Sequence, residues 1–386
     1  MGSTSQSSPN GRFVRAGAGS GSCRAFIPNP LPPVVEWDSE MVSMVSASDR
    51  AIGRLSSIGL MLPNPHLLVA PFKRREAVQS SRIEGTQASV DDLYLFEASQ
   101  AMESPFSDVR EVHNYVRALD FGLERSTTLP LSGRLMRELH EILMERVRGQ
   151  ERRRGQFRRI QNWIGPRDCA IEDATYIPPP PAELNETIDR LEEYLNAPSE
   201  LPPLVRLALV HYQFEAIHPF EDGNGRIGRL LIVLSLCMDK ILPEPLLYIS
   251  DALEKRRDEY YAHLLSVSNE SRWREWILYF LRAATEAAQD GAIRAQKLID
   301  LQTRYRIQFA GDRATTTIPL VELLFATPAL TVSETAKLLE VTSTTAQRAI
   351  NRLVEASVLQ EVTGQERNRV YVAKEIIKAI SSRMIS

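Results

Sequence analysis

The sequence predicts a mainly α-helical protein with a small β component. Apolar residues recur three and four positions apart over most of residues 38–306, which is the spacing of amphipathic helices. Strand-like patterns are confined to two short stretches, near residues 155–166 and 358–372. The 386 residues allow two or three domains, and the 43% hydrophobic content supplies enough apolar side chains for their cores.

The composition limits the class of protein. Lys and Arg number 46 against 49 Asp and Glu, so the net charge of −3 does not indicate a protein coated in nucleic acid. Three dispersed cysteines, Cys23, Cys169 and Cys237, argue against a disulfide scaffold and a Cys-rich zinc site. No apolar run approaches the ~20 residues of a membrane span, and the first residues lack the apolar centre of a signal peptide. We therefore expect a cytoplasmic protein that does not bind a membrane.

The first quarter of the chain is expected to hold a tail and a helical extension. Residues 1–24 are rich in Ser and Gly, which predicts a disordered tail with too little apolar surface to fold. Residues 25–104 form the expected N-terminal extension, which begins with a Pro-broken extended segment. Its helices are predicted at 38–60, at 72–82 and directly after Ser89, whose hydroxyl can cap the third helix.

A central helical unit is predicted over residues 105–290, followed by a linker helix at 291–317. Helical patterns in this part of the chain cover 107–123, 131–148, 182–196, 203–217, 225–240, 253–266 and 270–306. An Arg-rich stretch interrupts them between 145 and 167, and its second half ends in Gly165-Pro166. The spaced apolar residues before that turn signal predict a short β-hairpin over 155–166.

The last part of the chain, residues 318–386, resembles a winged helix-turn-helix domain. Two helical patterns, at 332–339 and 343–356, precede two strand-like segments at 358–363 and 369–372. The second helix would present polar side chains to DNA: Thr344, Thr345, Gln347, Arg348, Asn351 and Arg352. Because several Glu residues lie nearby, packing or contact with a protein partner remains an open alternative to DNA binding.

The most informative stretch is His218-Pro-Phe-Glu-Asp-Gly-Asn-Gly-Arg-Ile-Gly-Arg229, a polar loop between two apolar helical patterns. Gly223 and Gly225 permit the backbone to approach a ligand closely. Free N–H groups at the start of the following helix form an anion site. Arg226 and Arg229 lie on one face of that helix and suit a di- or triphosphate. The stretch lacks the Gly-Lys-Ser/Thr of a Walker loop and the alternating carboxylates of an EF-hand.

This stretch resembles the Fic family signature, His-Pro-Phe-x-Asp-Gly-Asn-Gly-Arg-x-x-Arg, at every specified position, and the resemblance extends over residues 105–290. Most characterised Fic proteins transfer AMP from ATP to a protein hydroxyl. The resemblance implies that His218 is the general base, that Asp222 holds Mg²⁺ and that Phe220 anchors the loop. It also implies a phosphate-binding set of Gly223, Asn224, Gly225, Arg226 and Arg229.

Two further segments have counterparts in the Fic family. The 155–166 hairpin resembles the flap that holds a target protein by strand addition, with Phe157, Arg158, Ile160 and Trp163 as the target-binding residues. Residues 254–261 resemble the segment that contributes to the adenine pocket, where Tyr260 and Tyr261 would bind the nucleotide. Arg256 stands where the family usually has Asn, so the base preference remains open, as does the packing of both tyrosines as ordinary core aromatics.

Residues 80–85, Ser-Ser-Arg-Ile-Glu-Gly, match the inhibitory motif of the family, Ser/Thr-x-x-x-Glu-Gly/Asn. The resemblance implies that Glu84, with Ser80 as the first motif residue, pairs with Arg229 and occupies the γ-phosphate position. A carboxylate and a guanidinium at ~4 Å attract each other by a few kcal/mol at intermediate dielectric, which is enough to shift the pose of a nucleotide.

The leading hypothesis is a Mg²⁺- and ATP-dependent protein adenylyltransferase that is autoinhibited by Glu84. It modifies Ser, Thr or Tyr of other proteins or of itself, and a homodimer is compatible with the family. Three alternatives remain: a DNA-binding regulator with a nucleotide-sensing core, transfer of another group such as UMP, phosphate or phosphocholine, and removal of AMP with the help of Glu84.

Overall fold

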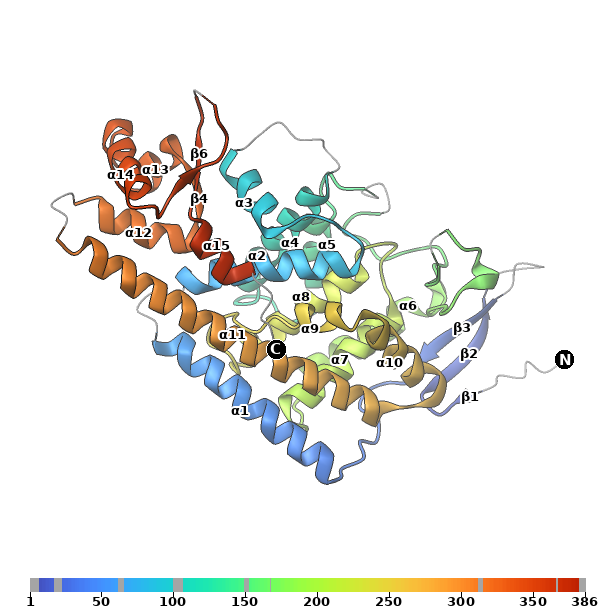
Figure 1. Cartoon of the computed structure of the whole chain (residues 1–386). Coiled ribbons are helices and arrows are strands. Elements are labelled where there is room, and N and C mark those ends of the chain that lie inside the picture. The colour runs from blue at the N-terminus through green and yellow to red at the C-terminus, as the bar shows by residue number, and fades with distance from the viewer. Residues whose placement is uncertain are drawn as a thin grey trace.

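The computed structural model confirms a mainly helical protein with small antiparallel sheets (Figure 1). It describes residues 7–16, 23–61, 66–99, 107–148, 153–166, 168–311, 315–365 and 367–381. No helix among these residues is long and apolar enough to cross a lipid bilayer.

The N-terminal segment differs from the expected tail. Strands β1 (Ser7–Ser8), β2 (Gly11–Ala16) and β3 (Cys23–Pro28) form an antiparallel sheet in the order β1-β2-β3. The expectation of disorder for residues 1–24 is therefore wrong for 7–16 and for 23–24, while the rest of that range lies outside the described residues. The sheet is held by distant parts of the chain, because Asn10 donates to the Tyr212 hydroxyl at 3.1 Å and accepts from the Trp273 indole at 3.0 Å. Local composition contains no sign of these contacts.

Three helices of the N-terminal extension follow the sheet: α1 (Ser39–Met61), α2 (His66–Ile83) and α3 (Val90–Ser99). Helix α2 begins earlier than the expected start at 72, because Pro71 does not end the helix but lies inside its second turn. Helix α1 packs along the long helix α11 (Trp273–Phe309) at one edge of the molecule (Figure 1).

The centre of the molecule is built from the predicted helices: α4 (Asp108–Arg125), α5 (Gly133–Leu143), α6 (Pro181–Asn196), α7 (Pro203–Ile217), α8 (Asn224–Met238), α9 (Ser250–Lys255) and α10 (Arg257–Glu270). A short 3₁₀ turn, η2 (Ile171–Asp173), lies between α5 and α6. Nearly every residue of α7 and α8 is buried, so these two helices form the core element. The loop that joins them carries the His218–Arg229 motif and is thereby fixed at both ends.

The expected hairpin at 155–166 is not present. Ile164 pairs instead with Tyr176 in a single antiparallel bridge, so the turn lies within residues 165–175. The first half of the segment is hydrogen-bonded to the motif loop, since the Arg158 N–H donates to the Pro219 carbonyl at 3.0 Å. That contact leaves no partner strand for residues 157–160.

The C-terminal part contains α12 (Thr317–Ala326), β4 (Ala329–Thr331), α13 (Val332–Leu338), α14 (Ser343–Glu355), β5 (Gln360–Glu361), β6 (Val370–Val372) and α15 (Lys374–Ser381). The two expected helices and both strands occur at the expected places, and β4 joins them in a sheet of order β4-β6-β5. Helices α12 and α15 pack against α2. Helix α11 crosses the expected border at residue 290 without a break, because its apolar face packs on both parts.

Candidate active site

The shape of the motif loop is set by two residues in the left-handed backbone conformation and by one asparagine side chain. His218 ends α7 with φ 50° and ψ 61°, and Gly223 precedes α8 with φ 77°. The Asn224 side chain accepts the Phe220 N–H and donates to the Phe220 carbonyl, both at 2.8 Å. The Asn224 side chain therefore closes the loop. The phosphate-binding role expected for Asn224 would then fall to its backbone N–H group.

The His218 ring is oriented by a backbone carbonyl. Its Nδ1 lies 3.3 Å from the Glu215 carbonyl, which accepts a hydrogen bond from Nδ1–H and leaves Nε2 as the nitrogen that could accept a proton. Burial lowers the pKa of His218 to about 4, assisted by the nearby Arg158 guanidinium. The imidazole is consequently neutral at physiological pH and able to take up a proton.

A second histidine supports the loop, and the sequence analysis did not single it out. His140 on α5 stacks on Phe220 with ring centroids 4.0 Å apart. Its Nδ1 accepts the Gly155 N–H at 3.0 Å, so its Nε2 carries the proton and donates to the Asp222 carbonyl at 3.1 Å. Burial lowers the pKa of His140 to about 4, which keeps this arrangement neutral.

The four expected target-binding residues separate into two pairs. Arg158 is 2% exposed and donates to the carbonyls of His218, Ile160, Pro179 and Ile217. Phe157 packs against Phe220 at 5.2 Å. The expected target contact by Arg158 is therefore wrong, because the free carbonyls at the end of α7 attract the guanidinium into the interior. Ile160 and Trp163 are 59% and 41% exposed and remain accessible.

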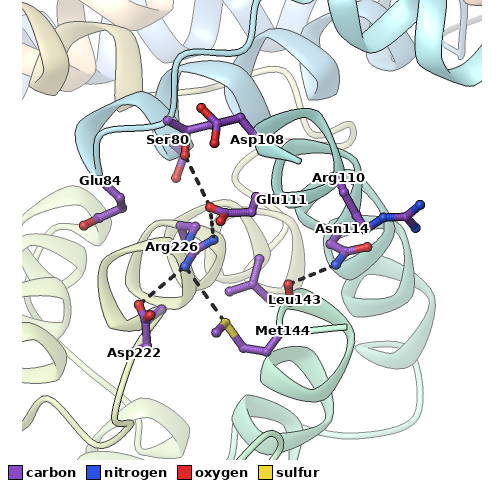
Figure 2. Close-up of polar contacts among 12 residues, drawn as sticks. Ser80, Glu84, Asp108, Arg110, Glu111, Asn114, Leu143, Met144, Asp222 and Arg226 are labelled. Atoms are coloured by element: carbon purple, nitrogen blue, oxygen red, sulfur yellow. Dashed lines mark hydrogen bonds and ion pairs between the residues drawn. The ribbon is translucent and has the colours of Figure 1, made fainter. Parts of the chain in front are cut away.

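Arg226 lies between two carboxylates at the start of α8 (Figure 2). Its guanidinium is 3.2 Å from Glu111 and 3.6 Å from Asp222, and it contacts the Met144 sulfur at 3.9 Å. Glu111, on α4, was not predicted from the sequence, because only the tertiary structure brings it to the motif.

Asp222 fits the metal-binding role that the sequence suggested. Its side chain is 37% exposed, and one of its oxygens accepts the Gly223 N–H at 2.6 Å. No cluster of three or more His, Cys, Asp or Glu suited to a metal ion occurs among the described residues. One carboxylate beside an anion site is the donor set that Mg²⁺ uses when phosphate oxygens and water complete its shell.

Arg229 is held by the end of α2. Its Nη2 lies 2.6 Å from Glu84 Oε1, and its guanidinium also donates to the Ser80 hydroxyl at 2.8 Å and the Ser80 carbonyl at 2.9 Å. Burial alone would raise the pKa of Glu84, but Arg229 lowers it below its usual range. The pair is thus ionised, and Glu84 lies against the first turn of α8, where a Cβ on Gly225 would be 2.2 Å from its Oε1.

A cavity of about 620 Å³ opens beside this pair. Its walls include His218, Arg229, Tyr260, Tyr261 and Trp163. Tyr260 is buried and its hydroxyl bonds His211 Nε2 at 2.9 Å, whereas Tyr261 is 37% exposed.

The unusual Arg256 is not part of the cavity wall. It pairs with Glu286 at 2.6 Å, and Arg257 lines the cavity in its place.

A polar loop between two buried helices, with a neutral histidine and paired arginines at a helix N-terminus, defines a nucleotide- or phosphate-binding class of protein. Residues 42–124 match the Fic/DOC family N-terminal domain, and residues 130–236 match the Fic/DOC family domain. The chain therefore belongs to the Fic/DOC family.

Relatives and solved structures agree with this assignment. The protein adenylyltransferase Fic of Drosophila erecta is 34% identical over 46% of this chain and 33% of its own length. The protein of the same name from Culex quinquefasciatus is 29% identical over 59% of this chain and 45% of its own length. The chain thus spans a third to less than half of these relatives.

The fold resembles a Fic family protein from Desulfovibrio desulfuricans G20, with a TM-score of 0.57 and 19% identity over 89% of this chain and 98% of that one. It also resembles Fic-1 from C. elegans, with a TM-score of 0.51 and 21% identity over 67% of this chain and 74% of that one.

Proposed function

We propose that this protein transfers AMP from ATP to a hydroxyl side chain of a protein, and that Glu84 restrains this activity. The observation that carries the proposal is the position of His218 at the mouth of an anion site formed by the start of α8, in the wall of a cavity of about 620 Å³. The relatives named protein adenylyltransferase support the choice of AMP and ATP.

In the proposed reaction, the hydroxyl oxygen of the target attacks the α-phosphorus of ATP. The bond from that phosphorus to the bridging oxygen breaks, and pyrophosphate leaves. His218 Nε2 accepts the hydroxyl proton as the new bond forms, a role worth about 10²–10⁴-fold in rate. Backbone N–H groups at the start of α8, with Arg226 and Arg229, offset the charge of the phosphates.

Asp222 is the residue that would hold Mg²⁺. The bound ion would supply charge neutralisation on the leaving pyrophosphate. Trp163, which lines the cavity, and the exposed Ile160 three residues before it are the residues we expect a target chain to contact.

Glu84 is the proposed brake because its carboxylate takes the guanidinium that would otherwise bind a phosphate. A charge-assisted hydrogen bond of about 1.5–3 kcal/mol corresponds to roughly 10–100-fold in an equilibrium between nucleotide poses. Glu84→Gly should therefore raise transfer by about that factor, and His218→Ala should abolish it.

The test is incubation of the wild type, Glu84→Gly and Glu84→Gly/His218→Ala with Mg²⁺ and α-labelled ATP, followed by gel and intact mass. Label on Glu84→Gly that is lost with His218 supports the transfer and the brake. Equal label on wild type and Glu84→Gly refutes the brake. If no label appears with ATP but label appears with UTP or a phosphocholine donor, the transferred group is UMP or phosphocholine and not AMP. Loss of AMP from a pre-labelled protein that needs Glu84 would indicate hydrolytic removal of AMP.

A second function is proposed for the C-terminal part, namely binding of duplex DNA by α14 and the β5–β6 loop. Thr344, Arg348 and Asn351 are exposed on α14, and Arg367 and Arg369 are exposed in the loop between β5 and β6. DNA binding that weakens steeply with salt and with Arg348→Ala, measured by fluorescence anisotropy, would support it. If the anisotropy of labelled DNA does not change when the protein is added, α14 and the β5–β6 loop serve packing or contact with a protein partner instead.

A further inference from the structure

The nucleotide cavity contains a second carboxyl group that the mechanism above does not use. Glu215 lies in the last turn of α7, three residues before His218, and both residues line the cavity. Its Oε1 is buried and has no hydrogen-bond partner among the described residues. Buried polar atoms are nearly always paired, so this carboxyl group, which also lines the cavity, has hydrogen-bonding capacity that the described residues do not use.

Glycine at position 228 makes room for this carboxyl group. A Cβ on Gly228 would lie 2.4 Å from Glu215 Oε1 and 3.1 Å from the Phe214 ring. The Glu215 carboxyl is therefore pressed against the first turns of α8, beside the anion site. Gly225 and Gly228 lie on one face of α8, with Glu84 against the first and Glu215 against the second.

The groups around Glu215 decide its charge. Burial raises its pKa to about 8; Arg229 opposes this rise and Glu84 adds to it. The other groups that face it or the cavity are His211 and His218 on α7, and Arg257, Asp258, Tyr260 and Tyr261 at the start of α10. The Arg229 guanidinium is hydrogen-bonded to Ser80 and Glu84, so it opposes the rise in the pKa of Glu215 without pairing with its carboxyl group.

We propose that Glu215 is a nucleotide-binding residue whose neutral carboxyl group donates a hydrogen bond to an oxygen of the sugar–phosphate portion of the nucleotide, next to His218. This inference rests on the proposed function, because it assumes that the cavity holds a nucleotide. A neutral acid can approach a polyphosphate without repulsion, whereas an ionised one would repel it. Nucleotide affinity should therefore fall as Glu215 loses its proton.

The test uses the full chain with its native Glu84 as the parent, because Glu84 contributes to the raised pKa of Glu215, and measures the Kd of ATP in excess Mg²⁺ by calorimetry at pH 7.5 and pH 9. Burial lowers the pKa of His211 and His218 to about 3 and about 4 and raises that of Tyr261 to about 12, so these groups keep their charge in this range. We expect the parent to bind about five- to tenfold more weakly at pH 9, as a single group of pKa near 8 requires.

Two variants and one control separate the outcomes. Glu215→Gln keeps an N–H donor without charge, so it should bind ATP within about twofold of the parent at pH 7.5 and show little pH dependence. Glu215→Leu should bind about tenfold more weakly at both pH values, while Glu259→Gln, which changes an exposed acid on α10, should behave as the parent. Thermal unfolding of each variant checks the fold.

Equal Kd values and equal pH dependence in the parent, Glu215→Gln and Glu215→Leu would overturn the inference and leave the proposed function intact. Failure of the parent itself to bind ATP would overturn both.

Discussion

At the scale of single residues, the site depends on groups whose charge is set by burial and by one neighbour. Arg229 keeps its charge in the interior because Glu84 lies 2.6 Å away, and burial alone would have lowered its pKa. His140 and His211 are buried without a counter-ion and stay neutral, which their low pKa values reflect. The buried charge of Arg229 is thus stabilised by an ion pair, whereas the two buried imidazole rings are uncharged.

The neutral histidines make folding sensitive to acid. In the unfolded chain a histidine takes up a proton below about pH 6.5, whereas folded His140, with its pKa of about 4, does not. Stability is therefore present above pH 6.5 and lost as the pH falls. At pH 5 the loss from His140 alone is on the order of 2 kcal/mol.

Urea unfolding at pH 7 and pH 5 measures this loss. We expect the difference in the free energy of unfolding between pH 7 and pH 5 to be smaller by about that amount in His140→Gln, because glutamine does not titrate. An identical pH dependence in His140→Gln and wild type would contradict the assignment of the loss to this ring.

At the scale of elements, the loop between α7 and α8 is held from outside by the segment at 155–166. Arg158 satisfies carbonyls at the end of α7, and Asn162 donates to the Phe220 carbonyl at 2.9 Å. Burial without a carboxylate lowers the pKa of Arg158 to about 10, so its positive charge is retained at neutral pH by carbonyl dipoles. This segment therefore positions His218 as well as bordering the cavity.

Arg158→Met tests this role. The change leaves buried carbonyls without donors, and we expect it to lower the free energy of unfolding by about 2–3 kcal/mol. It should also reduce transfer by Glu84→Gly far more than it weakens ATP binding, because His218 loses its support. Arg159→Met, the neighbouring exposed position, is the matched control. Unfolding free energies and labelling rates equal to those of the control would refute the positioning role.

At the scale of the whole molecule, helix α2, which ends next to the proposed brake Glu84, is connected to the C-terminal part by a series of ion pairs and a hydrogen bond. Arg75 on α2 lies 3.1 Å from both Asp251 and Asp290, and Asp290 pairs with Arg294 at 2.7 Å. Arg294 in turn donates to the Ile380 carbonyl of α15 at 2.8 Å. Helices α12 and α15 pack directly on α2, so the C-terminal part buttresses the helix that carries Ser80 (Figure 1).

Asp290→Asn should break this series of contacts, because the buried guanidiniums of Arg75 and Arg294 lose the carboxylate that they share. We expect a loss of about 3–5 kcal/mol in the free energy of unfolding and a rise in the basal labelling of the wild type, as α2 is held less firmly. Asp300→Asn, at an exposed site on the same helix, controls for the change of charge. Basal labelling that stays at the wild-type level in a folded Asp290→Asn protein would separate the C-terminal part from the brake.

The local features of the site could be predicted from the sequence. The spacing of His218, Asp222, Arg226 and Arg229 predicts a base and an anion site because all four lie within twelve residues, and helix periodicity places Arg226 and Arg229 on one face. Long amphipathic helices such as α1 and α11 were predicted for the same reason, since each residue of a helix depends on neighbours three and four positions away.

Other features required the tertiary structure. The N-terminal strands are stable because Asn10 reaches Tyr212 and Trp273, more than 200 positions away. Glu111 and His140 reach the motif from other helices, and the role of Glu215 becomes visible only with the packing of α7 on Gly228. The sequence by itself determined the His218–Arg229 motif and most of the helical segments, because both follow from short-range spacing. The tertiary structure decided which side chains are buried, charged and paired, because those properties depend on contacts between segments far apart in the chain.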